Sequence, residues 1–434
     1  MGVYQSDYWQ SCGWGMNRRE TQSGTYHPFL PDKLAGLDIM LTPEAVSAVT
    51  RAQSAVLLLN QEARFLTNTE PLARLLLRSE ALASSRIEGL QMNAGRLLEF
   101  EALDELGVSH RLDGVEAAVM ANIAAMSDAV GNIGAGDSIT VDDIRAVNAT
   151  LLQGSHLEDE GGVLRTIQNW IGGNNVNPVG AAYVPPRPEY VLELMEDLAQ
   201  FCNTSPLPAI SVAAIAHAQL ETIHPFADGN GRTGRALVHM LLHRAGLTPN
   251  SVPPISLVLA TDKARYINNL AAFRCDDGQC EGADEKAAAL QGCISDWVEY
   301  FANAVLLACE RAREFEHRIA DIQEEWRGRG AIRKNSSADV LIEVLPGNPV
   351  VSVVSAARLT GKSVQAARLA LKQLEGMGIL VQNAKNRKSN IYVAQEILDA
   401  FTAYERALAV PGGDTSSEKP MRPVLPRVPR DRCP

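Results

Sequence analysis

Cysteine is scarce in this chain, and the placement of its thiols excludes two kinds of stabilisation. Seven cysteines are scattered over 434 residues, and no two of them have Cys-x-x-Cys spacing. Such an odd set in a long chain predicts reduced thiols rather than a disulfide framework, and it offers no zinc-binding pattern.

Long apolar stretches are also lacking. No run approaches the ~18 residues that a membrane-spanning helix needs. Residues 1–20 are polar and aromatic and contain no apolar region of the kind found in signal peptides. We therefore expect a soluble, cytoplasmic protein that does not bind a membrane.

Positive charge is in deficit over the whole chain. The formal net charge is −11 at pH 7, which argues against a polyanion-binding molecule but leaves room for a local basic patch. The length of the chain predicts two or three domains and ample material for a buried core.

Runs of alternating β-branched residues are nearly absent between residues 41 and 246, where apolar residues recur at helical spacing. This pattern predicts a mainly α fold, with a helical N-terminal region over 26–110 and a helical core over 111–325. Residues 1–25 are expected to form a disordered tail. The basic, glycine-containing residues 326–336 are expected to form a linker.

The pattern changes after this linker. Short helices are predicted at 338–345, 353–359 and 363–377, and two strand-like segments follow them. Three helices and a hairpin over 337–408 resemble a winged helix-turn-helix domain. The Pro-rich residues 409–434 are expected to be a disordered tail.

Local charge makes DNA a candidate partner of residues 337–408. Between residues 334 and 410 the sequence contains nine Lys or Arg and six Asp or Glu, whereas the whole chain is acidic. The predicted helix over 363–377 would expose Gln365, Arg368 and Lys372. The predicted hairpin loop carries Lys385, Arg387 and Lys388. Winged helices also contact proteins, so a protein-docking role stays open.

The most informative segment runs from His224 to Arg235 and reads His-Pro-Phe-Ala-Asp-Gly-Asn-Gly-Arg-Thr-Gly-Arg. Its Gly-Asn-Gly turn, Gly229–Gly231, can direct backbone N–H groups at a phosphate because glycine tolerates positive φ angles. Residues 232–245 have helical spacing, so the turn opens onto a helix N-terminus, which favours anions. Arg232 and Arg235 share one helix face and can converge on one polyphosphate.

These residues supply the parts needed to attack a nucleotide triphosphate. His224 is the candidate general base, because its imidazole can accept a proton from a hydroxyl that attacks the α-phosphorus. Asp228 is the candidate ligand of Mg²⁺ or Mn²⁺. Asn230 and the surrounding backbone amides would hold the phosphates, and Arg232 and Arg235 would offset charge on the leaving pyrophosphate.

The segment matches the motif of the Fic family, His-x-Phe-x-(Asp/Glu)-Gly-Asn-Gly-Arg-x-x-Arg, at every specified position. The chain resembles this family over residues 26–312. Its members mostly transfer AMP from ATP to a Ser, Thr or Tyr hydroxyl of a target protein and release pyrophosphate. The resemblance implies a helical Fic core with a short β-hairpin flap, ATP as co-substrate, and a target protein or the chain itself as acceptor. It is compatible with a homodimer.

A second segment, Ser-Ser-Arg-Ile-Glu-Gly at residues 84–89, resembles the family's inhibitory motif, (Ser/Thr)-x-x-x-Glu-(Gly/Asn). Ser84 and Glu88 are four residues apart and share a helix face, and Gly89 is a natural helix terminator. In the family, the glutamate pairs with the second arginine of the catalytic motif and blocks the γ-phosphate site. Carried over, Glu88 would bind Arg235.

The resemblance assigns two further regions. The flap around residues 179–186, with Tyr183, Val184 and Pro185, would hold the target segment by strand addition. Tyr266 would pack near the nucleotide base. Three alternatives stay open: another Fic-type transfer, such as phosphorylation or phosphocholination; removal of AMP, with Glu88 positioning a water; and a DNA-binding regulator in which the Fic body is a sensor.

Overall fold

Helices make up most of the chain in the computed structural model, as the spacing of apolar residues predicts. The structure describes residues 2–11, 13, 15, 17–62, 70–104, 114–276, 280, 282–382 and 391–407. The helices that build the main body are α1 (Pro43–Glu62), α2 (Glu70–Ile87), α3 (Ala94–Asp104), α4 (Gly114–Gly131), α5 (Val141–Leu152), α6 (Val191–Thr204), α7 (Ala209–Ile223), α8 (Asn230–Arg244), α9 (Ile255–Thr261), α10 (Lys263–Phe273) and α11 (Ala283–Gly328).

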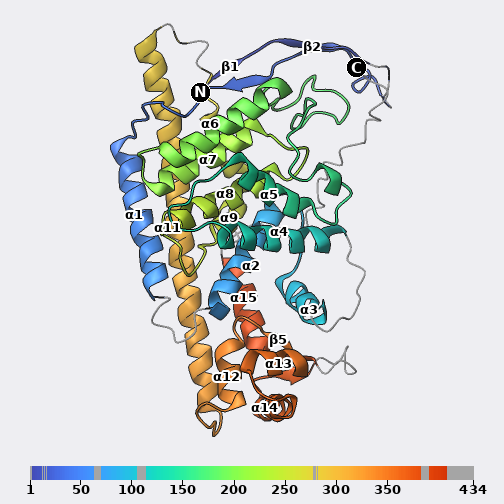
Figure 1. Cartoon of the computed structure of the whole chain (residues 1–434), viewed down its shortest axis with the longest axis vertical. Coiled ribbons are helices and arrows are strands. Elements are labelled where there is room, and N and C mark those ends of the chain that lie inside the picture. The colour runs from blue at the N-terminus through green and yellow to red at the C-terminus, as the bar shows by residue number, and fades with distance from the viewer. Residues whose placement is uncertain are drawn as a thin grey trace.

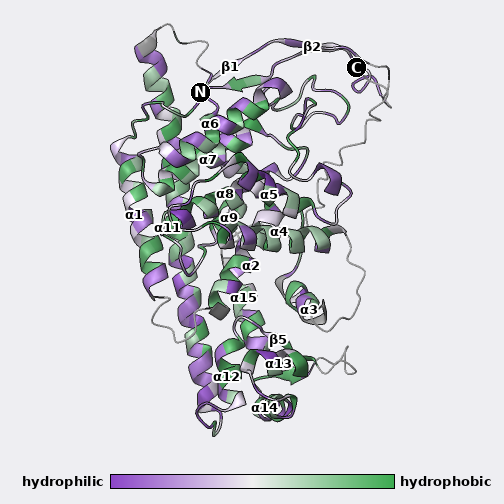
Figure 2. Ribbon diagram, in the orientation of Figure 1, coloured by the Kyte–Doolittle hydropathy of each residue, from purple (hydrophilic) through white to green (hydrophobic). Residues whose placement is uncertain are grey.

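The centre of the body is α7, which is buried on all sides from Ile210 to Ile223. It packs against α6, α8 and α11, while α2 lies between α4 and α9 (Figure 1). Trp297 of α11 fixes this arrangement by donating its indole N–H to the carbonyl of Ala214 at 2.7 Å. Hydrophilic and hydrophobic residues alternate along α1 and α11, as expected of helices with one buried face (Figure 2). Among the described helices, none has the length and apolar character required to cross a bilayer.

The first residues differ from the expected disordered tail. Short strands pair there in antiparallel fashion, β1 (Gly2–Tyr4) with β4 (Phe29–Pro31), and β2 (Asp7–Trp9) with β3 (Gly24–Tyr26). This segment is also fastened to the body. The Trp9 ring packs edge-on against Trp170 at 5.9 Å, and the Asn177 side-chain amide donates to the carbonyls of Arg19 and Glu20. Backbone pairing and these contacts satisfy polar groups that a free tail would leave to water.

The C-terminal unit, defined as residues 337–382 and 391–407, follows α11. It contains α12 (Ser337–Val344), β5 (Val350–Ser352), α13 (Val353–Thr360), α14 (Val364–Gly376), β6 (Val381–Gln382), β7 (Ile391–Val393) and α15 (Gln395–Ala407). Its strands form an antiparallel sheet in the order β5-β7-β6. Ser352 and Ser363 cap α13 and α14 by accepting from backbone N–H groups of the first turn.

The expected linker over 326–336 begins later than predicted. The last turn of α11 runs through Trp326 to Gly328, and the Trp326 side chain is fully buried. A large buried ring stabilises the end of the helix, whereas the basic residues around it had suggested a solvated linker. The basic loop with Lys385, Arg387 and Lys388, and the Pro-rich residues 409–434, lie outside the described residues.

Candidate functional site

The motif forms the turn between α7 and α8. His224 follows the last residue of α7 and caps it with a left-handed φ of 49°, a conformation that costs free energy in a residue with a side chain. Gly229, with φ 78°, directly precedes α8 as its N-cap. Asn230 closes the turn, because its amide accepts from the N–H of Phe226 and donates to the carbonyl of Phe226, both at 2.9 Å. The fully buried Phe226 ring seats the turn on the core.

This bonding changes the expected role of Asn230. Both ends of its side-chain amide are occupied by the backbone of Phe226, so the side chain shapes the turn and does not point to a phosphate. Phosphate binding by the backbone N–H groups of the glycine turn stays a prediction. Asn148 of α5 adds a further support, since its amide donates to the carbonyl of Asp228 at 3.0 Å and to Thr233 Oγ1 at 3.2 Å.

Arg165 holds the backbone of His224 in place. Its guanidinium donates to the carbonyls of His224 at 2.9 Å, Pro186 at 2.6 Å, Ile223 at 3.3 Å and Ile167 at 3.3 Å. The side chain is buried, and burial lowers its pKa to about 10, so it stays charged at neutral pH. Sequence alone does not predict this contact with the backbone of His224, because the partners of Arg165 come from three separate segments and no local pattern marks them.

The imidazole of His224 is neutral at physiological pH. Burial lowers its pKa to about 4, and the positive charges of Arg165 and Arg274 act in the same direction. Glu221 Oε2 lies 3.8 Å from Nδ1, but burial, reinforced by Glu88, raises the pKa of Glu221 to about 7. The contact is therefore too long and too weakly charged to be an ion pair, and His224 keeps the acceptor form that a general base needs.

Arg232 is a buried cation with unused hydrogen-bonding capacity. Its side chain is only 5 % exposed, and Nη2 lies 3.6 Å from Asp228 Oδ2. Its Nε and Nη1 have no hydrogen-bond partner among the described residues. Buried N–H groups without partners are costly, and an anion in the glycine turn would satisfy them.

Arg235 binds the end of α2 and Glu88, which follows it. Nε donates to Ser84 Oγ at 2.9 Å, and Nη2 donates to the Ser84 carbonyl and to Glu88 Oε1, both at 2.8 Å. The predicted contact between Glu88 and Arg235 is thus present. Burial opposes the ionisation of Glu88, but Arg235 and Arg232 outweigh it, so the pKa of this carboxyl lies below its usual value.

The Glu88 carboxylate also fills the glycine turn. A Cβ placed on Gly231 would lie 2.1 Å from Glu88 Oε1. α2 ends just before this point, and Gly89, with φ 82°, turns the chain away. The carboxylate therefore occupies the space over Gly231 in which the sequence predicts a phosphate.

Tyr266, which the resemblance places near a nucleotide base, is buried close to Arg235, and its role beside a base stays a prediction. Its hydroxyl lies 2.7 Å from His217 Nε2, and its ring is 2 % exposed. It packs against Trp297 in the aromatic cluster of α7, α10 and α11. Tyr266 is therefore a core residue.

The three flap residues are also more enclosed than strand addition requires. Tyr183 exchanges backbone hydrogen bonds with Ile171, and its hydroxyl donates to the carbonyl of Thr222 at 2.6 Å. The carbonyl of Val184 accepts from Phe29, and that of Pro185 accepts from the Gln168 amide. Strand pairing with a target at these residues would break contacts that the fold already uses.

The donor set fits a metal ion that arrives with phosphates. Among the described residues, no three His, Cys, Asp or Glu side chains gather in a metal-binding group. Asp228 is 52 % exposed at the mouth of the site. One accessible carboxylate suits Mg²⁺, which commonly takes its other ligands from phosphates and water.

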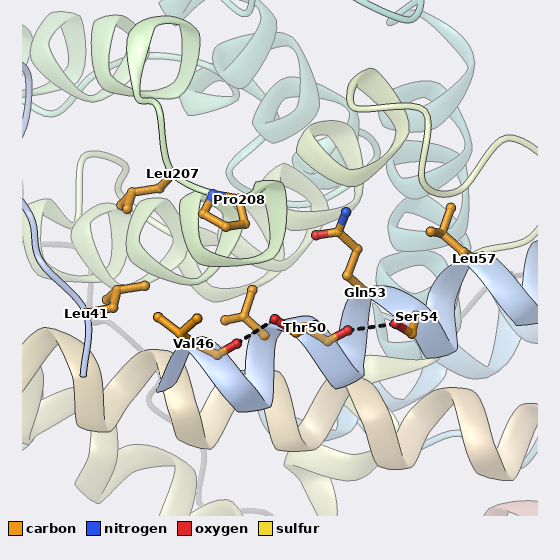
Figure 3. Close-up of a pocket in the computed structure, with 9 residues that line it drawn as sticks. Leu41, Val46, Thr50, Gln53, Ser54, Leu57, Leu207 and Pro208 are labelled. Carbon is orange, nitrogen blue, oxygen red and sulfur yellow. Dashed lines mark hydrogen bonds between the residues drawn. The ribbon is translucent and has the colours of Figure 1, made fainter. Parts of the chain in front are cut away.

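A groove elsewhere on the molecule is unrelated to the motif. It has a volume of 330 Å³ and runs along α1 beside Leu207 and Pro208 (Figure 3). The hydroxyls of Thr50 and Ser54 in this groove donate to carbonyls of α1 itself. Most of the side chains that line the groove are apolar, and these two hydroxyls are already hydrogen-bonded.

Comparison with known proteins agrees with the motif. The sequence model described as Fic/DOC family matches residues 138–242, which include the turn from His224 to Arg235. The model described as Fic/DOC family N-terminal matches residues 46–130, which include Glu88.

Two curated relatives and one solved structure illustrate the similarity. Protein adenylyltransferase fic-1 of Caenorhabditis elegans is 35% identical over 144 residues, 32% of this chain and 25% of that protein. Protein adenylyltransferase Fic of Drosophila melanogaster is 38% identical over 119 residues, 26% of this chain and 22% of that protein. A Fic family protein from Desulfovibrio desulfuricans G20 has 21% identity and a TM-score of 0.49, covering 82% of this chain and 97% of that one.

The chain spans about a quarter of the length of the curated relatives that it matches. The matches to the family's two sequence models fall on the segments that build the site, one on the helix before Glu88 and the other on the catalytic turn. Residues 138–242 therefore match the Fic/DOC family, and residues 46–130 match the N-terminal region of that family.

Proposed function

We propose that this protein is an adenylyltransferase that moves AMP from ATP to a Ser, Thr or Tyr hydroxyl of a target protein or of itself. The observation that carries the proposal is the neutral imidazole of His224 next to a glycine turn and a buried Arg232, whose Nε and Nη1 have no hydrogen-bond partner within the part of the chain that the structure describes. These are the parts that an attack on a phosphate ester needs. The two curated relatives are named protein adenylyltransferases, which supports this reaction over other transfers.

The proposed reaction proceeds by displacement at the α-phosphorus. The acceptor hydroxyl oxygen bonds to the α-phosphorus while His224 accepts its proton. The bond from the α-phosphorus to the bridging oxygen breaks, and pyrophosphate leaves. Arg232 and the backbone N–H groups of the turn hold the phosphates, and Arg232 and Arg235 offset the charge that develops on the leaving group. Asp228 would hold Mg²⁺ or Mn²⁺, which offsets phosphate charge when bound.

We further propose that Glu88 inhibits this reaction. Its carboxylate lies over Gly231 and holds the Arg235 guanidinium, so a triphosphate would have to displace it before binding fully. Removal of AMP is the alternative, because the same carboxylate, 38 % exposed, is placed to hold a water. The rate at which AMP is released from a target that already carries it separates the two roles. If Glu88→Gly abolishes this release, the result supports removal of AMP.

The position of the label in ATP tests the type of transfer. Glu88→Gly protein should become labelled by ATP that carries the label on the α-phosphate, and not by ATP labelled on the γ-phosphate. Label that arrives only from the γ-phosphate would identify a kinase. No incorporation from either, in the presence of a cell lysate that supplies targets, would refute the proposed function.

The C-terminal unit supports a second proposal, a winged helix-turn-helix that binds DNA. α14 buries Ala367, Ala370, Leu371 and Leu374 and exposes Gln365, Arg368 and Lys372, so its polar side chains face outward as the sequence predicts. Leu369, 60 % exposed on the same helix, favours docking of a protein instead.

Salt dependence separates these two partners. If DNA binds, affinity for a mixed pool of duplexes should fall steeply with salt, and Arg368→Ala or Lys372→Ala should each reduce the log–log slope by about 1. Binding that is absent or insensitive to salt would favour a protein partner. We also propose that the protein forms a homodimer and is located in the cytoplasm.

A further inference from the structure

The C-terminal unit contacts the same helix whose end carries Glu88. Figure 1 shows α15 below α2, between the main body and the α12–α14 group. Arg86 of α2 pairs with Glu405 of α15, with 3.5 Å between Nη2 and Oε2. About two turns of helix before Arg86, the same unit contacts α2 again, where Arg78 donates from Nη1 to the carbonyl of Gly347 at 2.7 Å.

Arg86 lies close in the chain to the residues that hold Arg235. It lies two residues before Glu88 and two after Ser84, and both of these hold Arg235. The last turn of α2 therefore contacts α8 of the main body on one side and α15 on the other. A restraint on Arg86 is a restraint on the position of Glu88.

Glu405 lies on α15, the last helix of the C-terminal unit, and α15 is held against α11. Its neighbour Tyr404 stacks on Phe315 of α11 at 4.6 Å, and the start of α15 is held by a bidentate pair of Glu396 with Arg329. The Glu405 side chain is 10 % exposed, and its Oε1 has no hydrogen-bond partner among the described residues. Burial raises the pKa of the Glu405 carboxyl, and the positive charge of Arg86 opposes this rise.

We propose that the C-terminal unit is a second restraint on inhibition: Glu405, through Arg86, holds the last turn of α2 so that Glu88 stays over Gly231. This inference rests on the proposed inhibitory role of Glu88. It makes the C-terminal unit a control element, because a partner that shifts α15 would loosen α2 and increase AMP transfer. Arg86 and Glu405 are positioning residues, and neither contacts the substrate.

Glu405→Gln is the sharpest test, because it removes the charge and keeps the size of the side chain. With Glu88 present, we expect AMP transfer to rise about threefold to tenfold, the shift produced when one partly buried ion pair is lost. With Glu88→Gly already in place, Glu405→Gln should add nothing. Arg311→Ala, which removes the exposed pair with Glu314 on α11, is the matched control and should change neither rate.

Two kinetic outcomes would overturn the proposal. An unchanged rate in Glu405→Gln with Glu88 present would show that the pair does not restrain α2. An equal rise with and without Glu88 would show that the effect does not pass through the inhibitory glutamate. A merely structural role for Glu405 would not produce this dependence on Glu88.

Hydrogen exchange tests the link without any reaction. Backbone amides at the C-terminal end of α2, residues 81–88, should exchange faster in Glu405→Gln and in Arg86→Ala than in the wild type or in Arg311→Ala. Unchanged exchange in this segment would refute the restraint. If exchange rises and yet no variant, including Glu88→Gly, transfers AMP, the proposed function fails while the link between the units stands.

Discussion

Arg232 and Arg235 lie three residues apart on α8, yet the fold gives them opposite surroundings. Arg235 is satisfied by Ser84 and Glu88, whereas Arg232 keeps Nε and Nη1 without partners among the described residues. The sequence predicts that both can reach one polyphosphate. The arginine that is already hydrogen-bonded is chosen by α2, which lies about 150 residues earlier in the chain. The spacing of residues around the two arginines cannot predict this contact.

At this scale the first prediction concerns His224. In the Glu88→Gly background, His224→Ala should lower AMP transfer by ~10²–10⁴-fold, the usual loss when a general base is removed. The measurement is incorporation of α-labelled ATP, with thermal unfolding to confirm that the fold is intact. His317→Ala, a change at an exposed histidine of α11, should leave the rate unchanged. Near-normal transfer by His224→Ala would exclude His224 as the base.

The second prediction concerns pH. Because the pKa of His224 is lowered to about 4, its imidazole is deprotonated and active above that value and is lost as base when pH falls through it. The kcat/KM of Glu88→Gly protein should therefore hold between pH 8 and 6 and decline below pH ~5. Glu221 has a raised pKa of about 7, so its own titration could change the rate in the same pH range. The control Glu221→Gln removes that titration. A halving of kcat/KM near pH 6.5 in that variant would contradict the lowered pKa of His224.

The third prediction concerns Gly231. A Cβ there would meet Glu88 Oε1 at 2.1 Å and Arg235 Nη1 at 3.0 Å. Gly231→Ala should therefore displace Glu88 and still fail to transfer AMP, because its methyl group fills the space of the phosphate. We expect a loss of ~10²-fold relative to Glu88→Gly alone, the size expected of a misplacement by 1 Å. Gly292→Ala, where a Cβ meets open space on α11, should transfer AMP normally. Activation by Gly231→Ala would contradict the phosphate site.

Among the elements, the turn between α7 and α8 shows where sequence reasoning succeeds and where it stops. Glycines before a helix N-terminus predict a tight turn that could bind an anion, and the structure has a turn there with Gly229 at φ 78°; anion binding stays a prediction. Two sets of hydrogen bonds were not predicted: those between the Asn230 amide and the backbone of Phe226, and those from Arg165 to four carbonyls, which we call the Arg165 clamp. Their partners are set by tertiary packing, and the carbonyl of Pro186 lies 21 residues from Arg165.

The flap also makes contacts that the sequence does not predict. The resemblance assigns target binding to Tyr183, Val184 and Pro185, but the N-terminal strand β4 brings Phe29 against the carbonyl of Val184. A strand of three residues carries almost no signal in sequence, so its competition for this edge of the flap could not be foreseen.

The fourth prediction tests the clamp. Arg165→Lys keeps the positive charge, but one ammonium cannot reach the four carbonyls that the planar guanidinium joins. We expect kcat to fall by about 10²-fold because His224 loses its position, and the free energy of unfolding to fall by roughly 1–3 kcal/mol. Urea unfolding and steady-state rates in the Glu88→Gly background measure both. Arg187→Lys, at the partly exposed pair with Asp7, is the control. A normal kcat in Arg165→Lys would exclude the clamp as a positioning device.

Over the whole molecule, α11 joins the catalytic body to the C-terminal unit, and α2 contacts both (Figure 1). Helical periodicity was sufficient to predict the mainly α body and the three short helices after α11. It was not sufficient to predict β1 to β4, whose strands pair over three residues each. It also gave no sign that Trp326 would be buried at the end of α11.

The central claim is that Glu88, held by Arg235, keeps the site closed to a productive triphosphate. Incorporation of AMP from α-labelled ATP by the wild type and by Glu88→Gly, side by side at equal concentration, tests it most directly. Glu88→Gly should be labelled strongly and the wild type weakly, while the double variant Glu88→Gly, Arg235→Ala should stay inactive because the phosphate ligand is lost with the obstruction. Equal labelling of the wild type and Glu88→Gly would contradict the account.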